Sequence, residues 1–341
     1  MRLERLTPNA NDWADVDRRG DRIVFQTREW VSFVAATQDA EPVFAAVKDG
    51  SATVGYFTGL VVRRFGIPIL GSPLPGWTTQ YMGFVLDEGV SDRAVAEALA
   101  AFAFDELGCM HVELRDPAIS IDAVSGLGFE YTRKVSLEVD LAREEDEIFA
   151  GMTSACRRCI RKAEKVGVIV EEAADDGFAD DYFAQLEDVF AKQSLVPMYG
   201  VDRVRALIEN LHPTGRLLLV RARAPSGECI ATGIFPALNR TMYFWGGASW
   251  RDFQIMRPNE AVMWYAMRYW KARGVEACDL GGGADYKRKY GGREIDTPFF
   301  RKSRFRAVSR MRALARQAFR QRQRAIGRLR RRSARLTASP E

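Results

Sequence analysis

The chain has 341 residues, of which 47% are hydrophobic and 28% are charged, which is the balance of a globular protein and leaves room for two domains. The sequence contains no run approaching about 18 apolar residues and has a polar N-terminus, so we expect neither a membrane-spanning helix nor a secretory signal, and a cytoplasmic location follows. Five scattered cysteines argue against a disulfide framework.

The net charge of +5 conceals an uneven distribution. Residues 301–341 contain 15 Lys or Arg and one acidic residue, so residues 1–300 contain 35 basic and 44 acidic residues. The sequence therefore predicts an acidic body followed by a strongly basic tail. From the element order below, we expect domains at residues 1–145 and 146–304 and the tail at residues 305–341.

The first part of the chain predicts a mixed α/β unit. After a polar leader we expect a short strand and then a helix that turns Trp30 and Phe33 inward, followed by a hairpin at Lys48-Asp49-Gly50. A loop rich in Gly and Pro then carries Trp77 and Tyr81, which either line an acceptor cleft or pin the loop with buried rings. Helix, strand, short helix and strand should follow over residues 92–107, 109–114, 119–127 and 128–141.

The second part begins with a basic helix. Thr153 or Ser154 is expected to cap a helix from Cys156 to Val166. Its residues Arg158, Arg161 and Lys165 recur at three- and four-residue spacing, so they share one side and would clamp an anion, although a solvated face explains such a run as well. Cys156 and Cys159 form a single CxxC pair, and because zinc requires four ligands we expect no metal site.

Helices are expected over residues 180–193 and 201–211, followed by three antiparallel strands. Residues 243–292 then read as strand, loop, helix, strand, glycine turn and short helix, which is a βαβ unit. Arg257-Pro258-Asn259 opens the central helix, with proline at a position where a missing backbone donor costs little, so the free amides of the first turn can hold an anion.

Five segments of this second half carry a family resemblance. They are IRKAEKVGV (160–168), YFWGGAS (243–249), RPN (257–259), DLGG (279–282) and YKRKYGG (286–292). In this order they resemble the FemABX-like, tandem-GNAT acyltransferases, which include peptidoglycan bridge aminoacyltransferases and CelD-like acetyltransferases of polysaccharide biosynthesis. The resemblance implies an α/β (α+β) fold with two GNAT-like domains that face a central cleft.

The resemblance implies one site residue, and the residue types and their positions suggest the others. It places a functionally important lysine at Lys287, which would stabilise an oxyanion or hold a phosphate unless it simply lies on a helix surface. Asp279 would orient Lys287 or accept a proton through water, and Glu260 is a second acidic candidate, although turns and first helical turns favour acids anyway. Donor binding is expected from Arg257, Asn259, Gly246 and Gly247, and acceptor binding from Arg158, Arg161, Lys162, Trp77 and Tyr81.

Three functions stay open at this point. The favoured one is an N-acyltransferase that uses acyl-CoA as a co-substrate, without a permanently bound cofactor, on an amino sugar or an envelope or polysaccharide precursor. The chain lacks the Gly-x-Gly pyrophosphate loop of coenzyme A-using GNAT domains, and it also lacks the coiled-coil arm of tRNA-dependent bridge aminoacyltransferases, the second alternative. A non-catalytic regulator that binds an anion or a membrane is the third.

The basic tail predicts an amphipathic helix. Val308, Met311, Leu314 and, further on, Phe319 and Ile326 recur at helical spacing among arginines. Such a helix would lie on an anionic membrane, which suggests peripheral attachment to its inner face. Capture of an anionic nucleotide and folding of the tail against the acidic body are the alternatives.

Overall fold

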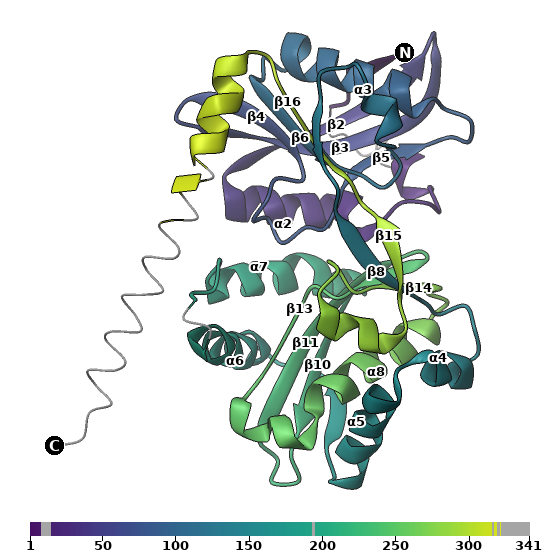
Figure 1. The fold of residues 1–341 in the computed structure, drawn as a ribbon, viewed down its shortest axis with the longest axis vertical. Coiled ribbons are helices and arrows are strands. Elements are labelled where there is room, and N and C mark those ends of the chain that lie inside the picture. The colour runs from purple at the N-terminus through teal and green to yellow at the C-terminus, as the bar shows by residue number, and fades with distance from the viewer. Residues whose placement is uncertain (8–14, 193–194, 316, 319–320, 322–341) are drawn as a thin grey trace, which may run out of the picture.

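The structure is a computed structural model that describes residues 1–7, 15–192, 195–315, 317–318 and 321. These residues form two eight-stranded sheets, one in each half of the molecule (Figure 1). The first sheet has the order β1-β2-β3-β4-β6-β16-β7, with β5 also paired to β3. Its strands are β1 (Arg2–Arg5), β2 (Ala40–Asp49), β3 (Ala52–Arg64), β4 (Ile67–Ser72), β5 (Gly83–Leu86), β6 (His111–Arg115), β7 (Glu130–Thr132) and β16 (Phe299–Ser303).

The second sheet has the order β15-β8-β14-β12-β11-β10-β9, with β13 also paired to β11. Its strands are β8 (Val135–Asp140), β9 (Ile169–Glu172), β10 (Leu217–Arg223), β11 (Cys229–Leu238), β12 (Thr241–Tyr243), β13 (Gly246–Ser249), β14 (Ala277–Asp279) and β15 (Arg293–Asp296). The main helices are α2 (Arg28–Gln38), α3 (Asp92–Ala101), α4 (Glu145–Gly151), α5 (Ser154–Lys165), α6 (Phe178–Lys192), α7 (Val201–Leu211) and α8 (Pro258–Lys271). None of these described helices is both long and apolar enough to cross a bilayer.

Both sheets contain one parallel pair joined by a helical crossover. In the first sheet β4 pairs in parallel with β6, and α3 lies between them in the chain. In the second sheet β12 pairs in parallel with β14 through α8, so the predicted βαβ unit is confirmed. This shared arrangement agrees with the expected duplication of one α/β unit, for which the sequence shows no repeat.

Local signals placed several elements correctly. The hairpin of β2 and β3 turns at Gly50, which adopts a φ of 59° that glycine tolerates without steric cost. Thr153 caps α5, because its hydroxyl oxygen accepts a hydrogen bond from the Cys156 amide at 3.2 Å. The strand expected before α2 is wrong: Val24–Gln26 is a 3-10 turn, and the Gln26 side chain donates to the Phe84 carbonyl at 3.1 Å, so the segment packs on the core instead of pairing.

The two sheets exchange strands across the predicted domain boundaries. β8 precedes residue 145 but lies in the second sheet between β14 and β15, whereas β16 precedes residue 304 but lies in the first sheet between β6 and β7. The chain therefore crosses between the halves before the second unit and again after it. At these crossings β8 and β15 run toward the first half (Figure 1). The boundaries at 145 and 304 stay predictions, and sheet membership departs from them at these two strands.

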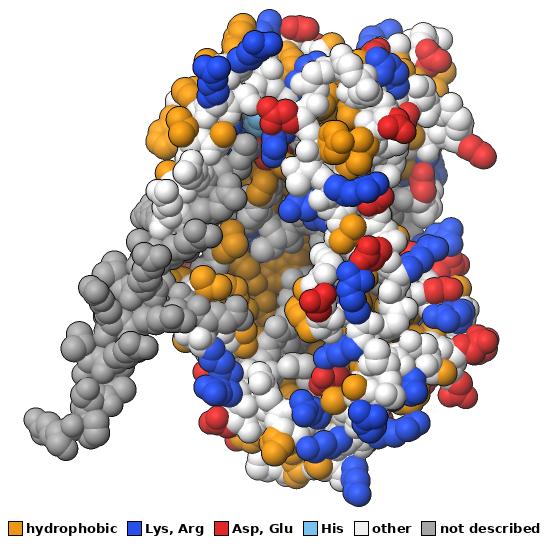
Figure 2. All heavy atoms as spheres, viewed as in Figure 1, with side chains coloured by type: hydrophobic (Ala, Val, Ile, Leu, Met, Phe, Trp, Pro, Cys, Tyr) orange, Lys and Arg blue, Asp and Glu red, His pale blue; other side chains and the backbone are white. Residues whose placement is uncertain are grey.

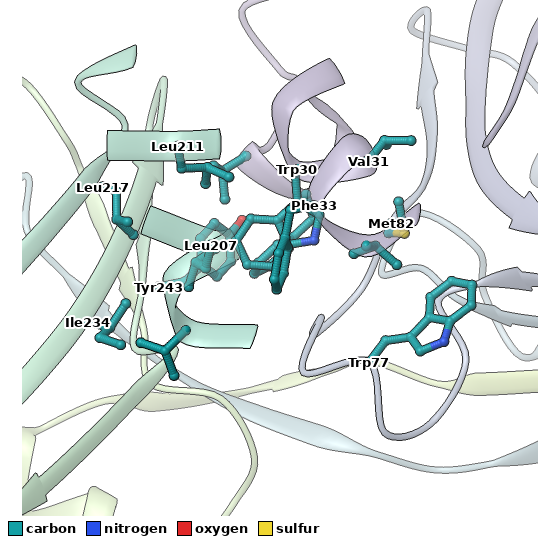
Figure 3. Close-up of a cluster of buried hydrophobic side chains, with 14 of the residues drawn as sticks. Trp30, Val31, Phe33, Trp77, Met82, Leu207, Leu211, Leu217, Ile234 and Tyr243 are labelled. Carbon is teal, nitrogen blue, oxygen red and sulfur yellow. The ribbon is translucent and has the colours of Figure 1, made fainter. Parts of the chain in front are cut away.

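A buried cluster joins the two halves into one body. Trp30 and Phe33 from α2 are fully buried against Leu207 and Leu211 from α7, and the ring of Tyr243 from the second sheet completes the contact (Figure 3). Burial of aromatic and aliphatic side chains is the main favourable contribution to such packing. The halves thus share a core, and the surface hollow between them in Figure 2 has hydrophobic side chains at its base.

Candidate active site

The parallel strands β12 and β14 separate at one edge of the second sheet. Their register ends at Tyr243 opposite Asp279, where the Phe244 amide still donates to the Asp279 carbonyl at 2.9 Å. Beyond this point the chain continues from β12 into β13, which pairs with β11. On the other side β14 continues into the glycine turn that begins at Gly281. Ligands of α/β proteins bind where parallel strands end, so this edge is the natural place for a site.

Asp279 is fully buried at that edge and holds three donors. Its Oδ1 accepts hydrogen bonds from the Ser136 hydroxyl and, at 2.7 Å, from the Gly281 amide, and its Oδ2 accepts one from the Tyr81 hydroxyl. Burial raises the pKa of this carboxyl, while the hydrogen bonds from Ser136 and Tyr81 act in the opposite direction. Both carboxylate oxygens are thus occupied by protein donors.

Lys287 lies beside this carboxylate and is partly buried. Its ammonium donates to the Leu280 carbonyl at 2.5 Å and to the Gly281 carbonyl, and it stands over the Phe244 ring at 5.3 Å from the centroid. Burial lowers the pKa of the ammonium, and the charge of Asp279 counteracts this. The sequence prediction that Lys287 and Asp279 share one edge is therefore met by the geometry.

Glu260 contacts a different lysine. Its carboxylate pairs with the Lys289 ammonium at 2.7 Å, and the Lys289 carbonyl accepts a hydrogen bond from the Thr153 amide at 2.9 Å. Gly291 has a φ of 79°, and a Cβ there would stand 2.5 Å from the Gly151 carbonyl oxygen, so only glycine allows this approach. The YKRKYGG segment thus ties α8 to the start of α5 as well as supplying Lys287.

The predicted donor residues separate into two groups. Asn259 donates to the Ser249 hydroxyl at 3.0 Å, which fixes the start of α8 to the end of β13. Gly246 and Gly247 lie in β13, and a Cβ on Gly246 would stand 2.3 Å from the Tyr182 hydroxyl oxygen, so this glycine serves close packing. Arg257 is exposed and takes a left-handed conformation just before α8.

Arg257 meets the basic face of α5. The two elements enclose an open groove of about 720 Å³, and Figure 2 shows Lys and Arg side chains gathered on this lower half of the molecule. Within the described part of the chain the groove cations make no ion pair, and Arg161 stands over the Phe149 ring at 5.3 Å. The groove is lined by Ala155, Arg158, Cys159, Arg161, Lys162, Lys165 and Arg257.

Trp77 and Tyr81 do not form an exposed cleft wall. Trp77 is 2% exposed in the cluster between the halves, where its carbonyl accepts a hydrogen bond from Arg203. Tyr81 is 6% exposed and bonds Asp279. Of the alternatives left open by the sequence, the loop pinned by buried rings is the one found, because this segment fills the space between two packed halves.

Sequence reasoning missed three neighbours of Asp279. Ser136 reaches it from β8, Tyr243 packs edge-on against Tyr81 at 5.9 Å, and the Arg115 guanidinium supplies a positive field while its own hydrogen bonds go to Thr297. Ser136 shares the polar face of its alternating strand with Glu138 and Asp140, so no local pattern indicates that its side chain is buried. Nothing local distinguishes the other two, because they come from distant parts of the chain.

The comparisons with known proteins bear on this arrangement. Residues 151–288 match the family described as an acetyltransferase (GNAT) domain. No curated protein matches the sequence.

Several solved structures share the fold. A structure described as FemX is 14% identical over 87% of this chain and 96% of that chain, with a TM-score of 0.71. A tandem GNAT protein from the clavulanic acid biosynthesis pathway is 12% identical over 89% and 98%, with a TM-score of 0.56. The C-terminal domain of a putative lysylphosphatidylglycerol synthetase from Agrobacterium fabrum is 12% identical over 83% and 89%, with a TM-score of 0.53.

The fold of these structures covers both halves of the chain, and the family match covers α5, α8 and the Asp279 edge. The two-domain α/β arrangement implied by the resemblance is thereby confirmed. The second half thus carries an acyltransferase domain of the GNAT type, and the chain as a whole has the two-domain fold of FemX and of the tandem GNAT protein.

Proposed function

We propose that the protein transfers an acyl group, acetyl in the simplest case, from acyl-CoA to the amine of an amino sugar or of a lipid-linked envelope or polysaccharide precursor. The observation that carries this proposal is the partly buried Lys287 ammonium at the edge where β12 and β14 separate. At this position the negative charge of Asp279 raises the pKa of the ammonium and so counteracts the effect of burial.

Lys287 is proposed to stabilise the charge that develops during transfer. The acceptor nitrogen attacks the thioester carbonyl carbon, the new C–N bond forms, and the C–S bond breaks as the thiolate leaves and takes up the proton given off by the amine. Negative charge gathers on the carbonyl oxygen in between. An ammonium shielded from water acts strongly on such a charge, because the effective dielectric constant around it is low.

Asp279 is proposed to be a positioning residue. Its two oxygens already accept three protein hydrogen bonds, which leaves it poorly suited to take a proton from the acceptor. One of the three donors is the Gly281 amide, and the Gly281 carbonyl in turn binds Lys287. Asp279 therefore holds the turn on which the ammonium rests.

The basic groove is proposed to bind the phosphates of the donor. The sequence assigned Arg257 to the donor and Arg158, Arg161 and Lys162 to the acceptor, but all four line the same groove. Arginines bind phosphate in bidentate fashion and the first-turn amides of α8 add a favourable dipole, so one anionic partner fits them jointly.

An aminoacyl-tRNA is the second candidate donor. The observation in its favour is the openness and size of the groove, because an RNA arm presents a row of phosphates that several cations can neutralise together. Both donors place an anion on α5 and an activated acyl group near Lys287, so the choice concerns the donor and leaves the reaction type unchanged.

We also propose that the protein works in the cytoplasm, attached peripherally to the inner face of the membrane. The basic composition of residues 305–341 supports this. Residues 306–315 are helical, as predicted for the tail. The predicted apolar positions Phe319 and Ile326 lie outside the described residues.

The proposal is tested by incubating the full-length protein with acetyl-CoA and pools of amino sugars and nucleotide-linked amino sugars, with acylated products detected by mass spectrometry. Lys287→Met should lower kcat/KM by about 100- to 1,000-fold, the usual effect of removing one group that stabilises an oxyanion. The matched control is Lys48→Met, at an exposed hairpin end, which should leave kcat/KM unchanged. Equal turnover by Lys287→Met and wild type would refute the assignment.

The two donors are separated by the same assay. Replacing acetyl-CoA with aminoacyl-tRNA should abolish product if acyl-CoA is the donor, whereas product from the charged tRNA alone identifies the second candidate. Arg161→Glu should raise the KM for the donor and leave the KM for the acceptor unchanged, because it reverses one charge in the groove.

A further inference from the structure

A bulky side chain occupies an unfavourable position in the first half. Phe65, in the turn between β3 and β4, is 99% exposed and has a φ of 53°, followed by Gly66 at 77°. Hairpin turns with two positive φ values favour Asn-Gly or Asp-Gly, and a left-handed phenylalanine is rare. The ring buries none of its surface and therefore contributes no apolar packing to the fold. Its presence at this position indicates contact with a partner.

The turn lies at the same sheet end as the start of the C-terminal helix. The Met110 amide bonds the Pro68 carbonyl on one side at 2.9 Å, and the Arg304 amide bonds the Met110 carbonyl on the other at 3.0 Å. Because neighbouring strands are about 4.8 Å apart, the beginning of β4 and the end of β16 are separated by only two such steps. The turn Arg63–Gly66 and the helix at residues 306–315 are thus neighbours.

The C-terminal helix is fixed to the first sheet by one face. Val308 is 8% exposed, the Ser309 hydroxyl donates to Glu130 at 3.2 Å, and the Arg312 guanidinium pairs with Glu113 on β6. Figure 1 shows the helix lying beside β4. These contacts come from sheet residues that are distant in sequence, so the helix belongs to the folded body.

The opposite face of this helix carries apolar side chains that remain outside. Met311 is 48% and Leu314 is 66% exposed. Successive helical residues are about 100° apart, so Met311 points away from Ser309 and therefore away from β7, toward β4 and its turn. Phe65, Met311 and Leu314 are thus exposed apolar side chains on two neighbouring elements, and Phe305 at the start of the helix is also 57% exposed.

Arginines surround this group. Arg63 and Arg64 precede Phe65, and Arg306 and Arg310 lie on the outer side of the helix; among the described residues none of the four makes an ion pair. Figure 2 shows hydrophobic and basic side chains together at the upper left, where Figure 1 places this helix. Exposed apolar rings framed by arginines match the boundary between acyl chains and anionic headgroups.

We propose that this docking face, formed by Arg63–Gly66 and the outer side of residues 305–315, binds a bilayer rich in anionic phospholipid, with Phe65 inserted among the headgroups. Charge complementarity selects this occupant, because a face whose four arginines make no ion pair among the described residues suits a negative, deformable surface better than an apolar protein partner. The inference rests on the peripheral attachment proposed above, for which it names the face, and it does not depend on the acyl transfer.

The test uses the full-length protein and vesicles of phosphatidylcholine, alone or mixed with phosphatidylglycerol, in sedimentation assays at low and high salt. Wild type should sediment with the mixed vesicles and much less with phosphatidylcholine alone. Phe65→Asn should weaken this binding about tenfold at both salt levels, because it removes one inserted apolar side chain. Its Tm should stay equal or rise, since asparagine suits the left-handed position.

Two further variants complete the experiment. Arg64→Glu should weaken binding strongly at low salt and little at high salt, because screening removes its contribution. Ile169→Thr, which shortens a 59% exposed side chain on β9 in the other half, should bind as wild type does. The proposal is overturned if Phe65→Asn binds like wild type, or if wild type does not sediment with the mixed vesicles, whether or not it binds a soluble RNA homopolymer.

Discussion

Tyr81→Phe is the substitution that most directly examines the buried Asp279 carboxylate. The change removes one hydroxyl and leaves the ring in place, so the packing against Phe25 and Tyr243 is retained. It takes away the donor to Oδ2 of Asp279, a carboxylate with no exposed surface. The remaining donors, Ser136 and the Gly281 amide, both bond Oδ1.

Removing the donor from a buried acceptor lowers the free energy of unfolding by about 1–3 kcal/mol, and the cost lies at the upper end of this range when the acceptor is charged. We therefore expect the free energy of unfolding to fall by about 2–3 kcal/mol at pH 8. The loss depends on pH, because the Tyr81 hydrogen bond holds the pKa of Asp279 down and its removal raises that pKa further. The pKa of Asp279 in the folded protein lies above its value of about 3.9 in the unfolded chain. The contribution of this carboxyl to stability is therefore present below about pH 3.9 and is lost as the pH rises through its folded-state pKa.

The expected result is a smaller destabilisation at pH 5 than at pH 8, measured by urea unfolding of wild type and variant at both values. Tyr131→Phe is the control, because Tyr131 is 53% exposed and contacts none of these groups, and it should change the free energy of unfolding by less than about 0.5 kcal/mol. A Tyr81→Phe protein as stable as wild type at pH 8, or equally destabilised at both pH values, would show that Asp279 does not depend on this hydroxyl.

Two more outcomes follow from the packing and the site. Trp30→Ala should lower the free energy of unfolding by about 3–5 kcal/mol, because Trp30 is fully buried between the halves and its indole also donates to Thr79; a cost below 1 kcal/mol in urea unfolding would mean that the shared cluster contributes little. The pH profile of kcat/KM should fall on the alkaline side below the ordinary lysine value of about 10.4, because burial lowers the pKa of Lys287 and the ammonium is lost as pH rises. A profile that stays flat to pH 10 would argue against a charged Lys287 in the reaction.

The C-terminal part of the chain returns to the first half of the molecule. β16 returns to the first sheet after the GNAT unit is complete, and its end leads into the helix that presents Met311 and Leu314. The C-terminal segment is therefore attached to the half of the molecule opposite the proposed catalytic edge. A membrane held at the docking face would leave the Asp279 edge in the other half free for substrates.

Much of the local structure could be predicted from the sequence. The helix at Val201–Leu211, the cap at Thr153 and the turn at Gly50 depend on neighbouring residues, because apolar period, capping oxygens and positive φ act over a few positions. The βαβ unit was predictable for the same reason, and with it the position of Lys287 and Asp279 at one strand end. The family motifs extended this to the reaction type.

Contacts between distant residues were decided by the tertiary structure alone. Tyr81 and Ser136 lie 198 and 143 positions from the carboxylate that they bond, and the exchange of β8 and β16 depends on which sheet edge each strand meets. The approach of Arg257 to the α5 cations and the burial of Trp77 likewise depend on packing between distant parts of the chain. A single sequence records propensity and period along the chain, whereas these pairings minimise exposed apolar surface and unpaired polar groups over the whole molecule, which no local pattern encodes.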